Sequence, residues 1–83
     1  MMYNYMTNGT CSRQIYLNIE DGIVKDVEFV GGCHGNLQGI CALVKGMPVE
    51  EVKARLAGIK CGFKQTSCPD QLAKAIDEAL AKA

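Results

Sequence analysis

The sequence has no tryptophan, no excess of either charge and no long apolar run, and each absence excludes a class of protein. Nine Lys and Arg residues balance nine Asp and Glu residues, so the chain lacks the basic surplus that a nucleic-acid backbone attracts. The longest apolar run, residues 40–44, is far shorter than the roughly 20 residues needed to cross a bilayer. The first residues show neither the charged nor the apolar segment of a secretory signal. We therefore expect a cytoplasmic protein that binds neither nucleic acid nor membranes.

Large side chains for a hydrophobic core are also few. Three Tyr and two Phe are the only aromatic residues among 83, and we expect one small domain over residues 1–83. Ordering such a chain costs roughly 1.5 kcal/mol per residue, and a chain of this size buries only about 60–65% of its surface. Proteins this small often depend on a disulfide, a metal ion or a partner subunit for stability. The partner subunit can be a second copy of the chain, so a homodimer is one possibility.

Five cysteines stand out in so short a chain. Without an export signal the thiols stay reduced, so metal binding or redox chemistry is a better explanation than a disulfide framework. The odd number of cysteines agrees with this. No C-x-x-C pair occurs, which separates the sequence from zinc fingers, zinc ribbons and ferredoxins.

Two segments predict a β-hairpin. Residues 13–20 alternate between apolar and polar side chains, and residues 24–30 form a second strand. Asp21 and Gly22 stand between the two segments, a dipeptide typical of hairpin turns.

The register of this hairpin depends on the length of its loop. A loop of three residues, 20–22, pairs Ile19 with Ile23 and keeps apolar side chains on one face of the sheet. It requires Gly22 in the left-handed conformation of a bulge. We therefore expect this loop rather than a two-residue turn.

Three amphipathic segments predict helices. The first covers residues 34–45 with Gly46 after it, the second opens at Pro48 and ends before Gly58, and the third begins at Pro69.

The order of these elements predicts the fold class. Strands precede helices, which favours an α+β fold. We expect a small antiparallel sheet, made of the hairpin 13–30 and open to a further N-terminal strand, with three helices packed on one face. On the third helix, Asp70 and Lys74 are spaced as an exposed ion pair.

The cysteines divide into one core position and four positions at bends. Cys41 lies on the apolar face of the first helix, as expected of a small buried hydrophobe. The other four stand where the chain bends: Cys11, Cys33, Cys61 and Cys68. Cys33 and Cys68 lie at the starts of helices, where unpaired backbone N–H groups and the helix dipole favour a thiolate.

Four converging thiolates would match a zinc site or an iron–sulphur cluster, and the residues do not choose between them. Two other interpretations remain open. In one, Cys61 with Cys68, or Cys33 with Cys68, forms a reversible disulfide that passes electrons to a reductase. In the other, the four thiols are reduced and hold no ligand.

The junction between the second strand and the first helix is a further candidate site. Such a junction can bind the phosphate of a nucleotide or flavin through backbone N–H groups, and the candidate residues are Gly31, Gly32, His34, Gly35 and Asn36. It lacks the P-loop lysine and the GxGxxG spacing, so a tight glycine turn is the stronger explanation. His34 is also a candidate ligand or proton carrier beside Cys33, with an ordinary surface position as the alternative.

Residues 66–70 read Thr-Ser-Cys-Pro-Asp, the motif that names the TSCPD domain. With the segment Gly-Gly-Cys-His-Gly-Asn-Leu at 31–37 and with Cys61-Gly62, the chain resembles the small stand-alone four-cysteine proteins of that family over nearly its full length. The resemblance implies that the family's four characteristic cysteines are Cys11, Cys33, Cys61 and Cys68.

Related domains stand at the C-terminal end of vitamin B12-dependent ribonucleotide reductases. The resemblance therefore implies an accessory role in deoxyribonucleotide synthesis, with a ribonucleotide reductase or another redox enzyme as partner. A chain this short cannot hold cobalamin, a nucleotide and a catalytic barrel, so we do not expect it to catalyse that reaction alone. The chain is also distantly similar to iron–sulphur cluster assembly scaffolds. It lacks an acidic partner beside its first cysteine, so that likeness implies a scaffold-like fold and not scaffold activity.

Overall fold

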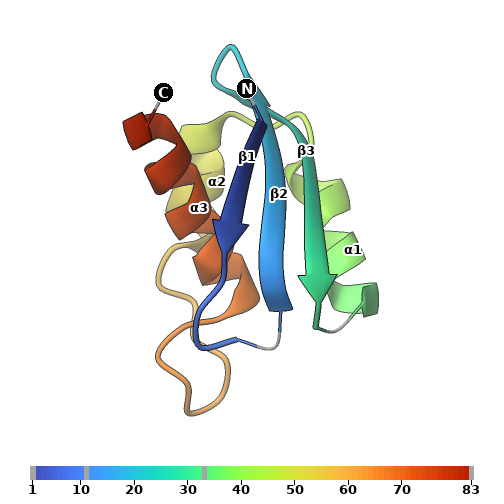
Figure 1. Cartoon of the computed structure of the whole chain (residues 1–83), viewed down its shortest axis with the longest axis vertical. Helices are drawn as coiled ribbons and strands as arrows, with labels where there is room; N and C mark the ends of the chain where they lie inside the picture. Colours follow the sequence, from blue (N-terminus) through green and yellow to red (C-terminus); the bar gives the residue numbers. More distant parts are fainter. Residues whose placement is uncertain (1, 11, 33, 83) are drawn as a thin grey trace.

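Three strands followed by three helices make up the computed structural model, which describes residues 2–10, 12–32 and 34–82. The strands form one antiparallel sheet in the order β1-β2-β3, and the helices lie behind it in the view of Figure 1. The elements are β1 (Met2–Met6), β2 (Ser12–Glu20), β3 (Ile23–Gly31), α1 (His34–Val44), α2 (Val49–Leu56) and α3 (Cys68–Lys82). The predicted α+β fold is confirmed, with β1 as the further N-terminal strand. Among the described residues, no helix has the length and apolar character needed to span a bilayer.

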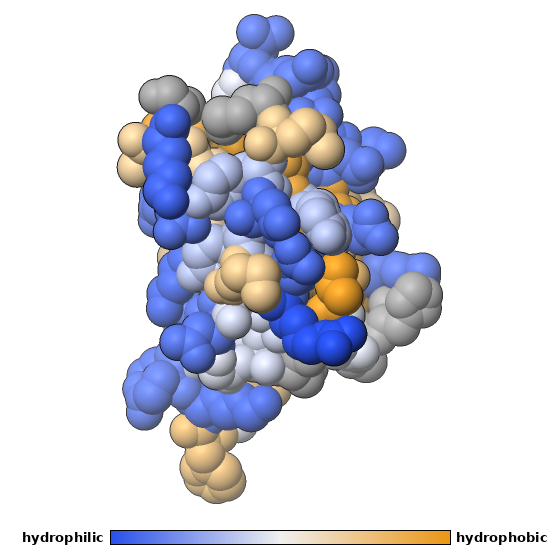
Figure 2. Space-filling model, viewed as in Figure 1, coloured by the Kyte–Doolittle hydropathy of each residue, from blue (hydrophilic) through white to orange (hydrophobic). Residues whose placement is uncertain are grey.

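The core lies between one face of β2 and the helices. Ile15, Leu17 and Ile19 project to this face, and they pack with fully buried side chains of α3 such as Leu72 and Ile76. Each fully buried Leu or Ile contributes about 1.5–3 kcal/mol relative to an exposed one. The opposite face of the sheet is open to solvent and mainly hydrophilic (Figure 2).

The turn between β2 and β3 corrects the expected loop length. Glu20 pairs with Ile23, which leaves a two-residue turn of Asp21 and Gly22. Both turn residues have positive φ, 54° and 73°, as a type I′ turn requires. The expected left-handed Gly22 is confirmed, but the three-residue loop is wrong.

A bulge in β3 explains why the shorter turn is compatible with a buried apolar face. Ile19 pairs with Val24 and Asn18 with Asp26, so Lys25 is the extra residue. The bulge places Val24 in the core and leaves Lys25 exposed. The expected register was wrong because it assumed a regular ladder along the whole of β3.

The three predicted helices are confirmed with small shifts at their ends. Gly46 follows α1 with φ of 87°, and its N–H donates to the carbonyl of Val24, which ties the connection between α1 and α2 to the edge of β3. Pro48 is the N-cap of α2 rather than a residue of its first turn, and α3 begins one residue earlier than expected, at Cys68.

This topology brings three connections to one end of the sheet. The loop between β1 and β2, the end of β3 and the loop of residues 57–67 between α2 and α3 all lie at the lower end in Figure 1. In the sequence, Cys11 falls between β1 and β2, Cys33 follows β3, and Cys61 belongs to the loop of residues 57–67. Cys68 directly follows that loop.

Candidate cysteine site

Cys61 and Cys68 line one small cavity. Cys61 is exposed in the loop between α2 and α3, and Cys68 is the buried first residue of α3. The cavity has a volume of about 20 Å³, and its remaining lining residues are Thr10, Lys64 and Ser67. Because a single water molecule needs roughly 10–15 Å³ measured in this way, the cavity has the size of one atom or ion.

The start of β2 contacts one of these two cysteines. The hydroxyl of Ser12, which is 3% exposed, lies 3.2 Å from Sγ of Cys68. Ser12 in turn pairs with Gly31 at the end of β3. Residues 10 and 12 flank Cys11 in the sequence, and residue 31 precedes Cys33 by two positions. Cys11 and Cys33 lie outside the described residues, so convergence of all four sulphur atoms stays a prediction.

The electrostatic surroundings of the cavity favour negative charge. Cys68 stands at the N-terminus of the 15-residue helix α3, where the unpaired N–H groups and the dipole present positive partial charge. Lys64 adds a cation to the same lining. A thiolate at the first position of α3 stays a prediction, and these positive charges are its physical basis.

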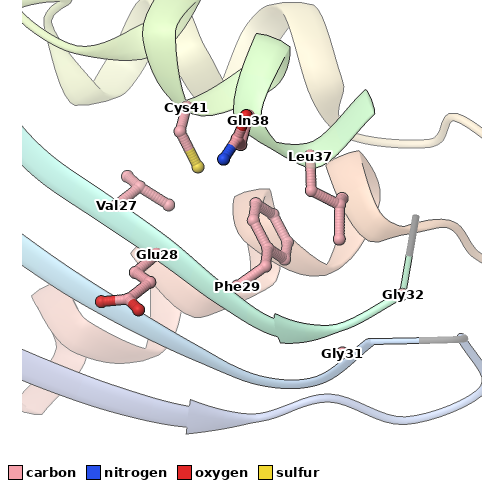
Figure 3. Close-up of a pocket in the computed structure, with 8 residues that line it drawn as sticks. All are labelled: Val27, Glu28, Phe29, Gly31, Gly32, Leu37, Gln38 and Cys41. Carbon is pink, nitrogen blue, oxygen red and sulfur yellow. The ribbon is translucent and has the colours of Figure 1, made fainter. Parts of the chain in front are cut away.

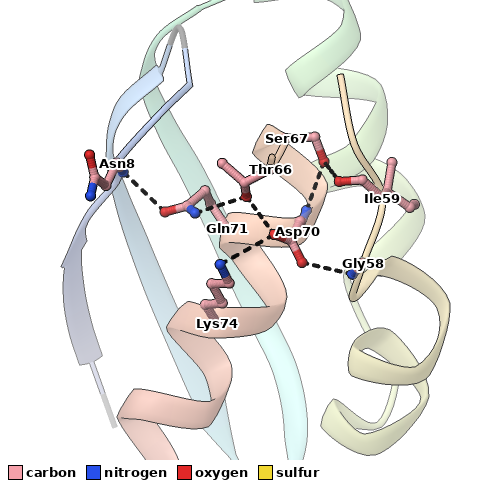
Figure 4. A network of polar contacts seen from close by, with 8 residues as sticks. All are labelled: Asn8, Gly58, Ile59, Thr66, Ser67, Asp70, Gln71 and Lys74. Carbon is pink, nitrogen blue, oxygen red and sulfur yellow. Dashed lines mark hydrogen bonds and ion pairs between the residues drawn. The ribbon is translucent and has the colours of Figure 1, made fainter. Parts of the chain in front are cut away.

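The loop that carries Cys61 is held by a buried carboxylate. Asp70, only 6% exposed, accepts a 2.7 Å hydrogen bond from the backbone N–H of Gly58 and another from the hydroxyl of Thr66 (Figure 4). These two bonds, with the charge of Lys74 at 3.5 Å, hold the pKa of Asp70 below its usual value despite its burial. The predicted ion pair of Asp70 with Lys74 is confirmed, but Asp70 is buried and anchors the loop, so its expected exposure is wrong.

Ser67 fixes the other side of the same loop. Its Oγ accepts a hydrogen bond from the N–H of Asp70 at 3.1 Å, which caps the first turn of α3. The Ser67 hydroxyl also donates to the carbonyl of Ile59 at 2.6 Å. Cys61 closes the loop further, because its N–H donates to the carbonyl of Thr66 at 3.2 Å.

A third set of contacts ties the β1–β2 loop to α3. The amide of Gln71, a residue 2% exposed, donates to the Thr66 hydroxyl at 2.9 Å and accepts from the N–H of Asn8 at 3.0 Å. Gly9 has a φ of 77°, and a Cβ there would lie 3.2 Å from Cγ2 of Thr66. The motif residues Thr66, Ser67 and Asp70 therefore hold together the segments that border the cavity, while Cys68 lines it.

The described residues contain no group of three or more His, Cys, Asp or Glu side chains that could hold a metal. Of the four predicted ligands, two are described, and these two share the cavity. Cysteine is a common zinc ligand in proteins, so a cavity of this size lined by two cysteines is compatible with Zn²⁺.

The predicted phosphate site borders a different pocket. Gly31 and Gly32 line a pocket of about 310 Å³ between β3 and α1, together with Phe29 and Leu37 (Figure 3). Gly35 and Asn36 are exposed in the first turn of α1, and the side chain of His34 is outside the description. The described lining is largely apolar and includes Glu28 but no cation, which does not favour a phosphate. Phosphate binding stays a prediction.

Cys41 lies apart from the cysteine cavity. It is half-buried, packs against the core and lines the pocket between β3 and α1. Burial, followed by the charges of Asp26 and Glu28, raises the pKa of its thiol. This agrees with the assignment of Cys41 to the apolar face of α1, although its burial is partial.

Sequence reasoning missed the anchoring residues of the loop. Asp70 was assigned to the exposed face, and Thr66 and Gln71 received no role. A local signal existed for part of this arrangement, because Ser67 and Asp70 have the spacing of a capping box. The partners of Asp70 had no such signal, since Gly58 lies 12 residues away.

Comparison with known proteins gives one match. The model of the TSCPD domain matches residues 1–80 of the chain. No curated protein and no solved structure matches the chain.

Proposed function

The chain belongs to the TSCPD domain family, and we propose that it is a small metal-binding module in which Cys11, Cys33, Cys61 and Cys68 hold one ion. The observation that carries the proposal is the cavity shared by Cys61 and Cys68. Thr10, the sequence neighbour of Cys11, lines the same cavity, and Ser12, its other neighbour, contacts Sγ of Cys68.

The size of the cavity supports a single ion over a cluster. About 20 Å³ accommodates one atom, whereas an iron–sulphur cluster adds several iron and sulphide atoms between the thiolates. Zn²⁺ has no preferred geometry of its own and binds four thiolates in structural sites. We therefore propose zinc, with an iron–sulphur cluster as the outcome that the experiment below distinguishes.

A metal at this position has a structural role. When bound, Zn²⁺ supplies bonds between chain segments that are far apart in sequence. Structural zinc sites contribute on the order of 10 kcal/mol of apparent folding free energy. For a chain with few large core residues, a contribution of this size decides how stable the domain is. Thr66, Ser67 and Asp70 keep the loop of Cys61 in place before the ion binds.

Metal analysis of anaerobically purified protein, with an absorbance spectrum, tests the proposal. We expect close to one equivalent of zinc and no visible absorbance. Iron with sulphide and a visible spectrum would replace zinc by a cluster, and the absence of both metals would overturn the proposal.

Cysteine variants assign the ligands. Cys61→Ser and Cys68→Ser should each reduce bound metal and lower the unfolding temperature. Cys41→Ser is the matched control, because Cys41 lines a different pocket, and it should keep the wild-type metal content. Equal metal loss in all three variants would contradict the assignment.

The accessory role in ribonucleotide reduction is supported only by the family's kinship with the C-terminal domains of vitamin B12-dependent reductases. We propose that the module serves a ribonucleotide reductase or another redox enzyme. Activity of such a reductase, measured with and without this protein, tests the role. A rate that is independent of the module in its metal-loaded form would overturn it.

A redox pair of Cys61 and Cys68 is the second candidate, and their shared cavity favours it. In this reaction an oxidant of the thiol–disulfide class takes two electrons and two protons as the S–S bond forms between the two sulphurs. Mass spectrometry of alkylated protein should then show loss of two hydrogens and a single linked peptide pair. Mixed oxidation of many thiols would exclude this candidate.

A further inference from the structure

The loop between α2 and α3 carries a fully exposed aromatic side chain. Phe63 has an exposure of 106%, the highest among the exposed large apolar residues. A side chain of this size in water forgoes the free energy that its burial would release. Exposed apolar residues are common on proteins, so the surroundings of Phe63 decide whether its exposure has a role.

The backbone around Phe63 is held in place. The N–H of Lys64 donates to the carbonyl of Cys61 at 3.0 Å, which closes a four-residue turn with Phe63 near its apex. Gly62 adopts the positive φ of 58° that the turn needs. The bond from the Cys61 N–H to Thr66 closes the base of the loop. Phe63 is therefore presented on an ordered turn.

The loop is positively charged although the whole chain is neutral. Residues 57–67 include Lys60 and Lys64 and no acidic residue. Lys60 precedes and Lys64 follows Phe63 in the sequence, and both are exposed. The loop thus carries an exposed aromatic group and two cations, and a complementary surface is an apolar pocket with negative charge beside it.

The same molecule has such a pocket. Val27, Phe29 and Leu37 point into the space of about 310 Å³ between β3 and α1, with Cys41 at its inner wall (Figure 3). Its described lining contains no cation. Glu28 is the acidic residue of this lining, at the outer edge of β3, so negative charge stands at the border of the pocket.

The loop and the pocket lie at the same end of the molecule. The loop of residues 57–67 and the end of β3, with Gly31 at the pocket, are both at the lower end of the sheet in Figure 1. Two copies that face each other with these ends can exchange both contacts at once, which is the arrangement of a two-fold interface.

We propose that the chain forms a two-fold dimer in which Phe63 of each copy enters the pocket between β3 and α1 of the other. The loop with Lys60 and Lys64 then lies near Glu28 of the second copy. Neither Phe63 nor the described lining of the pocket contributes a proposed ligand, but Lys64 also lines the cysteine cavity, so metal content is measured in every variant.

Analytical ultracentrifugation of the full chain over a concentration series, with metal content measured in the same samples, tests the dimer. We expect a monomer–dimer equilibrium that Phe63→Ala weakens by about tenfold or more, as for a buried aromatic at an interface centre. Leu43→Ala is the matched control, since Leu43 is 78% exposed and lines neither surface, and it should leave the equilibrium unchanged.

A charge exchange tests which surfaces meet. Lys64→Glu and Glu28→Lys should each weaken the dimer, and the double variant should regain part of the loss, because each copy again offers opposite charges at both contacts. A double variant weaker than both single variants would overturn the proposed pairing.

Thiol labelling reports pocket occupancy directly. The alkylation rate of Cys41, measured by peptide mapping, should fall as wild-type concentration rises and should stay constant in Phe63→Ala. A monomer at all concentrations, a dimer that survives Phe63→Ala unchanged, or open-ended assembly into larger species would each overturn the proposal.

Discussion

The backbone N–H of Gly58 donates to Oδ1 of Asp70 at 2.7 Å, across 12 residues of sequence. Asp70 is the last residue of the Thr-Ser-Cys-Pro-Asp motif, and Gly58 opens the loop that carries Cys61. One buried carboxylate therefore connects the loop of one cavity cysteine to the helix that begins with the other.

Asp70→Asn should destabilise the fold by about 1–3 kcal/mol, because an amide replaces one acceptor oxygen by a donor that faces the N–H or hydroxyl partners of Asp70. Urea unfolding measures the change. Asp77→Asn is the matched control on the same helix, since Asp77 is 64% exposed in its ion pair with Lys53 and should change stability by less than about 1 kcal/mol. Equal losses in the two variants would contradict a special role for Asp70.

The lowered pKa of Asp70 makes stability depend on pH. Because its pKa is lower in the folded than in the unfolded chain, the unfolded state binds more protons in the acid range. The contribution of Asp70 to the free energy of unfolding is therefore complete above its ordinary pKa of 3.8. It is lost as the pH falls through the lower pKa that Asp70 has in the folded chain. Unfolding free energies measured from neutral pH into this range should fall more steeply for the wild type than for Asp70→Asn. Parallel curves would contradict the prediction.

Ser67→Ala should cost about 0.5–2 kcal/mol through loss of the helix cap, and it also removes the hydrogen bond to the carbonyl of Ile59. Ser67→Thr keeps a hydroxyl that both accepts and donates, so it should retain most of the stability. Thermal unfolding of both variants gives the comparison. A threonine variant as unstable as the alanine variant would show that the hydroxyl contacts do not stabilise the loop.

Gly9→Ala should be more destabilising than Gly22→Ala. Both glycines have positive φ, 77° and 73°, which costs a side-chain-bearing residue about 1–2 kcal/mol. At Gly22 a new Cβ meets nothing within 4 Å, whereas at Gly9 it meets Cγ2 of Thr66 at 3.2 Å. Chemical unfolding of the two variants isolates that contact.

A double variant checks the same contact from the other side. Thr66→Ser removes Cγ2 and keeps the hydroxyl that bonds to Asp70, so it should relieve part of the cost of Gly9→Ala. Strictly additive losses in the double variant would mean that Gly9 and Thr66 do not compete for space.

Much of the fold could be predicted from local patterns. The alternation around Ile15 and Leu17 indicated the buried face of β2, and Gly46 and Pro48 marked the boundary between α1 and α2. The bulge at Lys25 shifts the alternation of β3 by one position, so that Val24 and Val27 are both buried. The sequence did not reveal it, because Ile23 and Val24 are both apolar and the alternation is compatible with either of them facing the core.

The candidate site, like the fold, could be predicted from the sequence only in part. The sequence by itself determined that four cysteines stand at bends and that Cys68 opens a helix, because turn residues and helix periodicity are local properties. Only the tertiary structure decided that Cys61 and Cys68 line one cavity and that Asp70 is buried against Gly58. Those relationships depend on how the loop of residues 57–67 folds back on α3, and that path is set by hydrogen bonds between residues distant in sequence.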